Sequence, residues 1–275
     1  MRCDLHSHSS HSDGLLTPET LAARAAARGV ETFALTDHDE TSGLAAARRQ
    51  AEESGMTFIN GVEVSVTWQG RTVHVVGLHI DPQDAELDAG LGALRAGRDR
   101  RAEAMAAGLA KAGIADSLEG ARRHAKNPAL VGRTHFARHL VERGHARDVQ
   151  AVFRNYLTPG KPGYVPRDWA TLAQAVHWIC HSGGMAVLAH PGRYRLDGAQ
   201  REALLSEFRD AGGVGIEVVT GSHSADQFLE YARCAQHYGL LASMGSDFHG
   251  PAESRCDLGS LPGLPYACTP IWSRF

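Results

Sequence analysis

The feature that most constrains this chain is a repeated unit, in which a helical pattern precedes a short apolar run that ends in a histidine or an acidic residue. Such runs include ETFALTDHD, MTFINGVEVS, MAVLAHPG and LLASMGSDFHG, and a similar run, MRCDLHSH, opens the chain. Helices that alternate with short apolar strands are typical of a parallel sheet, either open or closed into a barrel. The sequence therefore predicts an α/β fold.

The polar residues at the ends of these runs are expected to meet. In parallel α/β folds the carboxyl ends of the strands lie on one face, and that face holds the functional site. On a strand, residues i and i+2 share a face, so His6 with His8, and Asp247 with His249, can each bind one ion. The predicted metal-binding residues are His6, His8, Asp13, His38, Glu63, His74, His190, Asp247 and His249.

This set of ligands predicts more than one divalent ion. The donors exceed what a single ion can use, whereas about two or three ions could share them if Glu63 bridges. Imidazole and carboxylate without thiolate favour Mn²⁺, Fe²⁺ or Zn²⁺ over Cu(I). The 5 cysteines are scattered and form no CxxC pair, which disfavours a disulfide framework and favours the cytoplasm. No apolar run of about 18 residues and no signal-peptide pattern is found, so no membrane association is expected.

The middle of the chain, residues 84–166, interrupts the alternation with helical patterns. It holds 14 Lys and Arg against 9 Asp and Glu, a net charge of +5, while the rest of the chain carries -8. We therefore expect a barrel domain of residues 1–83 and 167–275, and a helical insert of residues 84–166 that acts as a lid over a polyanionic substrate. An arginine-rich helix can equally be a solvated surface. The candidate phosphate contacts are Arg101, Arg133, Lys161, Arg193 and His223.

The motifs DLHSHSSHSDG, LTDHD, NGVEVS, VHVVGL, LAHPG and GSDFH, in this order, resemble the successive motifs of the polymerase-and-histidinol-phosphatase (PHP) family. The resemblance spans almost the whole chain and implies a distorted, TIM-like (β/α)7 barrel with a trinuclear metal centre. It implies three ligand sets: His6, His8, Glu63 and Asp247; Glu63, His74 and His190; and Asp13, His38 and His249. Asp13 stands where some relatives have histidine. Mn²⁺ is expected, and Zn²⁺ or Fe²⁺ stay open.

The insert, with GRTHFAR and GKPGYVP, is similar to a stand-alone branch of this family. That branch implies a phosphatase that removes the 3'-phosphate from nucleoside 3',5'-bisphosphates, such as adenosine 3',5'-bisphosphate, and leaves AMP. It also implies that His135 contacts a substrate phosphate. Paired divalent ions can share a hydroxide and neutralise phosphate oxygens. Asp13, His38 or His249 are the candidate catalytic residues that assist the leaving oxygen.

Several alternatives remain open. They are a 5'-to-3' exoribonuclease acting on short 5'-phosphorylated RNA, a histidinol-phosphate phosphatase, and a non-catalytic metal-binding PHP module. A net charge of -3 and the lack of aromatics interleaved with basic residues disfavour a dedicated RNA-binding protein. Histidinol phosphate, with one phosphate and a cation, fits a basic lid poorly. No polymerase domain is expected after Phe275, which disfavours the module. The expected partner is a small phosphorylated nucleotide, with no protein partner evident.

Overall fold

The computed structural model describes residues 2–127, 130–166 and 169–275. Its strands form one sheet whose spatial order follows the sequence. They are β1 (Cys3–Asp4), β2 (Thr32–Leu35), β3 (Thr57–Trp68), β4 (Arg71–Leu78), β5 (Met185–Leu188), β6 (Gly215–Thr220) and β7 (Leu241–Gly245).

The sheet curls so that its first and last strands meet. The amide of Leu5 donates to the carbonyl of Met244 at 3.1 Å, and the amide of His8 donates to Phe248 at 2.9 Å. The segments that follow β1 and β7 thus run side by side, and the predicted α/β barrel with seven strands is confirmed.

One strand departs from the expected parallel arrangement. β4 pairs antiparallel with both β3 and β5, whereas the other neighbouring strands pair in parallel. A two-residue turn, Gln69 and Gly70, joins Trp68 to Arg71, and both turn residues have positive φ. This backbone geometry is that of a tight hairpin turn, so no crossover helix separates β3 from β4.

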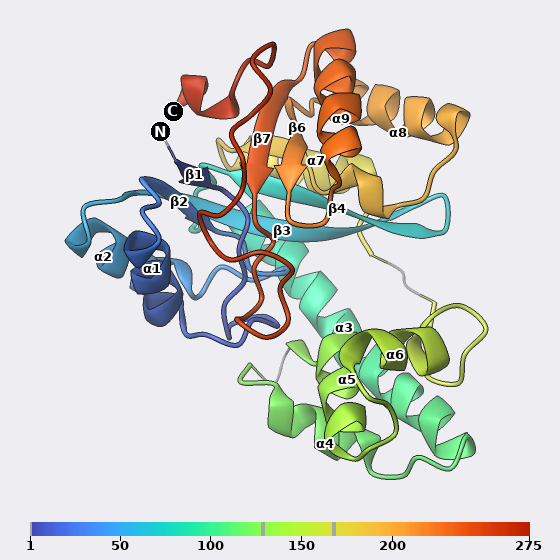
Figure 1. Cartoon of the computed structure of the whole chain (residues 1–275). Coiled ribbons are helices and arrows are strands. Elements are labelled where there is room, and N and C mark those ends of the chain that lie inside the picture. The colour runs from blue at the N-terminus through green and yellow to red at the C-terminus, as the bar shows by residue number, and fades with distance from the viewer. Residues whose placement is uncertain (1, 128–129, 167–168) are drawn as a thin grey trace.

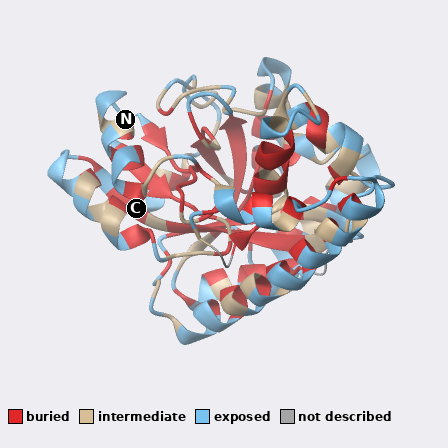
Figure 2. Cartoon of the chain, turned by 90° about the horizontal axis from the view of Figure 1, so that it is seen from below, coloured by how far each residue is buried: buried red, intermediate tan, exposed pale blue. Residues whose placement is uncertain are grey.

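Helices between the other strands cover the outside of the barrel. These are α1 (Pro18–Ala27), α2 (Leu44–Glu53), α7 (Leu172–His181), α8 (Gly198–Asp210) and α9 (Ala225–Tyr238). In α1 the Thr17 hydroxyl accepts the amide of Thr20, and Pro18 occupies the first turn, as its sequence predicts. Seen from below, buried residues fill the strands and the inner helix faces, while exposed residues lie on the outer faces (Figure 2). No helix among the described residues is long and apolar enough to cross a membrane.

The insert builds a second apolar cluster. Its helices are α3 (Ala85–Lys111), α4 (Ser117–His124), α5 (Arg133–Glu142) and α6 (Val149–Val152), followed by the π-helical turn η2 (Phe153–Leu157). Figure 1 shows α4, α5 and α6 gathered around the far end of α3. Leu87 and Leu91 of α3 pack into the barrel core, whereas Met105 and Leu109 pack into the insert core. The two cores therefore meet along one continuous helix, which begins beside the predicted boundary at residue 84. The second predicted boundary adjoins residues 167 and 168, which lie outside the described residues.

Candidate metal centre

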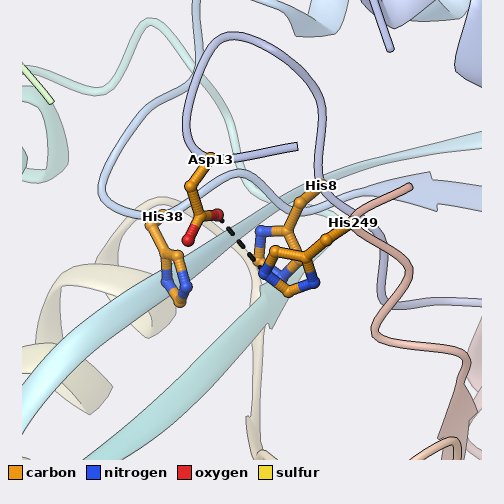
Figure 3. Close-up of side chains that lie close together, drawn as sticks. All are labelled: His8, Asp13, His38 and His249. Atoms are coloured by element: carbon orange, nitrogen blue, oxygen red, sulfur yellow. Dashed lines mark ion pairs between the residues drawn. The ribbon is translucent and has the colours of Figure 1, made fainter. Parts of the chain in front are cut away.

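The nine predicted metal-binding residues all lie at the mouth of the barrel. His6, His8 and Asp13 follow β1, and His38 follows β2. The remaining five come from β3, β4 and the segments after β5 and β7: Glu63, His74, His190, Asp247 and His249. Their donor atoms fall into four overlapping groups: His8, Asp13, His38 and His249; His6, His190 and Asp247; His6, His8 and Glu63; and His38, Glu63 and His74. Figure 3 shows the first of these groups.

Glu63 occupies the centre of the cluster. Its carboxylate is fully buried, and Oε1 lies 2.8 Å from His74 Nδ1 and 2.9 Å from His190 Nε2. Oε2 lies 2.9 Å from His38 Nδ1. One carboxylate oxygen therefore faces the imidazoles from β4 and β5, and the other faces the imidazole after β2. Two oxygens directed at different imidazoles would allow Glu63 to serve more than one ion.

The donor atoms are arranged to share a divalent cation rather than to hydrogen-bond to one another. The Nε2 atoms of His6 and His8 are only 3.1 Å apart, and both lie within 3.4 Å of Glu63 Oε2. Glu63 Oε2 and His38 Nδ1 lie 2.9 Å apart, and Asp13 Oδ1 lies 3.3 Å from His249 Nε2, yet within the described chain Glu63 Oε2, His38 Nδ1 and Asp13 Oδ1 are buried without a well-directed hydrogen bond. Leaving such atoms unpaired costs free energy, which a cation bound between them would offset.

The charges in the cluster shift several pKa values. Burial opposes ionisation of Glu63, but the imidazoles of His74 and His38 outweigh it and hold the pKa of that carboxyl well below its usual range. Burial lowers the pKa of His8 to about 3, and it lowers the pKa of His190 to about 3 as well. Both rings are therefore neutral at pH 7, which is the form that binds a metal ion.

Two carboxylates connect the cluster to the rest of the pocket. Asp247 Oδ1 lies 3.2 Å from His8 Nε2, while Oδ2 accepts a hydrogen bond from Arg193 Nη1 at 2.7 Å. Asp13 Oδ1 lies 3.3 Å from His249 Nε2, and Oδ2 accepts from the Thr134 hydroxyl at 2.9 Å. Through Thr134 the insert helix α5 reaches the mouth of the barrel.

Sequence reasoning missed Glu217. It is buried in β6, its Oε1 accepts a hydrogen bond from His6 Nδ1 at 2.8 Å, and its Oε2 accepts the His190 amide at 2.6 Å. The first bond directs Nε2 of His6, with its lone pair, towards the cluster. A signal existed, because Glu217 is the only charged residue within the apolar run VGIEVV.

A cavity of about 150 Å³ adjoins the cluster and extends to the insert. The cluster contributes Asp13, His38, Glu63, His74, Asp247 and His249, with Arg193 held beside it by Asp247. The rest of the lining includes Arg98, Arg101, Arg133, Thr134, Phe153 and Trp169. The described residues thus place an acidic and imidazole-rich wall opposite a basic wall.

The arginines of this basic wall differ in their partners. Arg98 is buried and pairs with Asp39 and the Ser65 hydroxyl, so it attaches α3 to the barrel. Arg101 is also buried, packs its guanidinium on Trp169, and pairs with no carboxylate in the described part of the chain. Burial, together with the charge of Arg98, lowers the pKa of Arg101 to about 9. An unpaired buried guanidinium is stabilised by an anion.

Arg133, at the start of α5, resembles Arg101. Its guanidinium lies over the Phe153 ring, and the described residues give it no carboxylate partner. Burial, together with the positive charge of Arg193, lowers the pKa of Arg133 to about 10. Arg101 and Arg133 therefore form a pair of uncompensated cations in the cavity, which is the arrangement expected of a phosphate site.

Three predicted substrate contacts lie elsewhere. His135 is buried, and its Nδ1 accepts the Gly132 amide at the start of α5, so it caps the helix that carries Arg133. His223 uses both ring nitrogens within the protein, with Nδ1 donating to Val218 O and Nε2 accepting the Gly192 amide. Lys161 is exposed on a loop. None of the three is among the residues that line the cavity.

Comparison with known proteins identifies the family. The PHP domain family matches residues 4–221. The chain belongs to the PHP family. The imidazole and carboxylate donor groups at the mouth of the barrel support a divalent metal ion as cofactor.

Relatives with assigned activities cover nearly the whole chain. A 3',5'-nucleoside bisphosphate phosphatase from Chromobacterium violaceum is 54% identical, over 98% of this chain and 94% of that protein. The 5'-3' exoribonuclease Rnm from Escherichia coli is 44% identical, over 98% of this chain and 92% of its own length. A structure from Bifidobacterium adolescentis, described as a metal-dependent phosphoesterase, is 26% identical with a TM-score of 0.82 and covers 98% of this chain and 93% of that one.

Proposed function

We propose that this PHP protein is a phosphoric monoester hydrolase that removes the 3'-phosphate from nucleoside 3',5'-bisphosphates. The observation that carries the proposal is the 54% identity to a phosphatase of this activity over 98% of the chain. The cavity agrees with a substrate that has two phosphates, because it offers a metal-binding wall for one and unpaired arginines for the other.

The nine cluster residues would hold about two or three divalent ions, and we propose Mn²⁺ as the ion. Bound there, the ions would neutralise the phosphate oxygens and lower the pKa of water at the site. The three ligand sets implied by the family resemblance are compatible with the four groups of donor atoms, since each implied set shares at least two residues with one group. Glu63 belongs to two implied sets, in agreement with its two differently directed oxygens.

The protein's own side chains would orient the substrate. We propose that Arg101 and Arg133 bind the phosphate that is not cleaved, because their guanidinium groups line the cavity without acidic partners in the described chain. Arg193 is held by Asp247 beside the cluster, where it can contact the reacting phosphate. The charge-assisted bonds of arginine suit both positions.

Proton transfer to the leaving oxygen is proposed for the Asp13 and His249 pair, with His38 beside it (Figure 3). Burial opposes protonation of His249, but the Asp13 carboxylate outweighs it and raises the pKa of His249 to about 9. Asp13 Oδ1 lies 3.3 Å from His249 Nε2, and both residues line the cavity. With no ion held by Asp13, His38 and His249, a protonated His249 would be placed to donate to an alkoxide; with an ion bound there, the ring would be a neutral ligand and that ion would stabilise the alkoxide instead.

A second candidate is a 5'-to-3' exoribonuclease acting on short RNA, favoured by the 44% identity to the Escherichia coli enzyme. Both candidates would use the same cluster, since each reaction breaks a phosphate ester. They differ in whether the bond that breaks joins a terminal phosphate or links two nucleotides.

A panel of substrates tests the proposal. Purified protein with Mn²⁺ is given adenosine 3',5'-bisphosphate, a 5'-phosphorylated oligoribonucleotide and histidinol phosphate, and the release of inorganic phosphate and of nucleotides is measured. The bisphosphate should give AMP and phosphate with the highest kcat/KM. An equal or higher kcat/KM on the oligonucleotide would instead favour the nuclease, and preference for histidinol phosphate would contradict both.

A further inference from the structure

Three side chains of the insert form a second cluster of metal-ligating groups. His124 ends α4, while His139 and Glu142 lie one helical turn apart on α5. One donor atom from each lies within 4.8 Å of the others. None of the three lines the cavity at the barrel mouth, so this cluster is separate from the proposed active site.

The distances fit a small divalent ion. Glu142 Oε2 lies 3.0 Å from His124 Nε2 and 3.8 Å from His139 Nδ1. Ligands of a tetrahedral zinc ion, each about 2.1 Å from the metal, are about 3.3 Å from one another. We propose that His124, His139 and Glu142 bind a Zn²⁺ ion that joins α4 to α5.

An unpaired atom points into this cluster. The His139 side chain is only 5% exposed, and its Nδ1 is buried with no hydrogen-bond partner among the residues described. A buried ring nitrogen without a partner costs free energy, which a metal bond removes. Gly120 of α4 lies against this ring, since a Cβ there would approach its Cε1 to 2.3 Å. The packing therefore holds the ring in place and directs Nδ1 towards Glu142.

The charges favour a metal of moderate affinity. An imidazole binds a metal ion through an unprotonated ring nitrogen, and His139 Nδ1 is free of other partners in the described chain. Two imidazoles and one carboxylate suit Zn²⁺ better than Mg²⁺ or Ca²⁺. The side chains of His124 and Glu142 are 27% and 60% exposed, which leaves room for water as a fourth ligand. The guanidinium of Arg123 repels any cation and weakens this site.

The ion would act on the insert and not on the reaction. The α5 helix that carries His139 and Glu142 begins with Arg133 and Thr134, which line the cavity. Binding at the other end of α5 would fix this helix against α4 without contacting substrate. A structural zinc ion contributes its binding free energy to the stability of the folded segment.

Two variants and a control test the proposal in the full-length protein. His124→Arg keeps a cation beside Glu142 but removes a metal ligand, and Glu142→Gln removes the carboxylate. His177→Gln is the control, because His177 forms an exposed pair with Glu86 at 2.9 Å that belongs to none of the metal-ligating groups. Zinc content after equilibrium dialysis and the zinc-dependent shift in Tm are measured for each.

Wild type and His177→Gln should bind one more zinc ion per chain than either variant. The part of the zinc-dependent rise in Tm that comes from this ion should be lost in both variants. The metal-free Tm of His124→Arg should stay near that of the wild type, since the ion pair with Glu142 is retained, and its Mn²⁺-dependent turnover should be unchanged. Equal zinc content in wild type and the two variants would overturn the proposal, as would equal zinc-dependent shifts in Tm.

Discussion

At the scale of single residues, the candidate site depends on carboxylates that orient imidazoles. Glu217 accepts from His6 Nδ1 and from the His190 amide, so it fixes the ring of one proposed ligand and the backbone of another. The His190 backbone has a φ of 26°, a conformation that residues other than glycine rarely adopt, and the hydrogen bond from its amide to Glu217 helps to hold it.

Glu217→Gln should weaken metal binding. Glutamine has one side-chain oxygen, which cannot accept both hydrogen bonds. Its side-chain NH2 group must therefore face either His6 Nδ1 or the backbone N–H of His190. If the NH2 group faces His6, it donates to Nδ1. The ring then carries its proton on Nε2, and that nitrogen cannot bind a metal ion. Mn²⁺ affinity should fall about 10–100-fold, and excess Mn²⁺ should restore much of the activity. The measurement is kcat/KM as a function of Mn²⁺ concentration.

The matched control for this prediction is Glu230→Gln, which removes the acidic partner of Arg201 on the barrel surface. That variant should keep the wild-type dependence on Mn²⁺. The same Mn²⁺ dependence in Glu217→Gln and wild type would show that His6 is oriented without Glu217.

The position of a site residue can be predicted from sequence where a regular strand fixes the direction of its side chain. His6 and His8 could be predicted because both follow a strand at i and i+2, and the mouth of a barrel collects such residues. His223 also follows a strand, yet its ring bonds Val218 and Gly192 instead of facing the cavity. Loop conformation decides this outcome, and no local pattern in the sequence encodes it.

At the scale of elements, α3 joins the two parts of the substrate pocket. Arg98 ties the helix to the barrel through buried Asp39, and Arg101, nearly one turn later, presents its guanidinium to the cavity. The sequence predicted this helix from its pattern and Arg101 as a candidate phosphate contact, but it did not show that Arg98, which also lines the cavity, pairs with Asp39. The four arginines between 95 and 101 lie at different angles around the helix, and only packing against the barrel selects one face.

Arg101→Ala should raise KM for the bisphosphate roughly 10–100-fold, with a smaller effect on kcat, because the hydrogen bonds of a charged donor contribute about 1.5–3 kcal/mol. Arg100→Ala is the matched control, since Arg100 is the adjacent exposed residue on the same helix and does not line the cavity. Steady-state kinetics on adenosine 3',5'-bisphosphate measures both. An equal KM in the two variants would remove Arg101 from substrate binding.

The β3–β4 hairpin departs from the parallel sheet that the sequence led us to expect, because β4 runs antiparallel to both neighbours. Gln69 and Gly70 between two strand-like runs were the available signal, although Gln is an unusual residue for the first turn position. The hairpin brings His74 of β4 beside Glu63 of β3, on the same face of the pair. Although β4 runs antiparallel, His74 still lies in the metal-binding cluster at the barrel mouth.

At the scale of the whole molecule, the proposed ligands connect nearly every strand end around the barrel mouth. Bound metal would therefore act as a cross-link between segments that are distant in sequence. Anything that binds only the folded state stabilises it by mass action, by about 2.7 kcal/mol at a concentration 100 times Kd. The removal of metal should accordingly lower the stability of the whole barrel.

Treatment with a chelator should abolish activity and lower Tm by about 5–10 °C, with both restored by Mn²⁺. The stabilisation should be larger at pH 8 than at pH 6. Burial disfavours the charged form of His249, but Asp13 outweighs it and raises the pKa of His249 to about 9, so protons compete with metal more strongly at lower pH. Calorimetry with and without Mn²⁺ at both pH values measures this. A shift in Tm that does not depend on pH would show that His249 is not a ligand.

The continuity of α3 limits how this pocket can open. The helix begins against the barrel, where Gly90 touches the indole of Trp178 so closely that a Cβ would approach it to 2.6 Å, and it ends in the core of the insert. Because α3 is continuous between the two cores, a change in the angle between them would have to bend this helix. While α3 stays straight, the distance from its arginines to the metal cluster is fixed, so the spacing between the two phosphates of a substrate should decide whether both are bound at once.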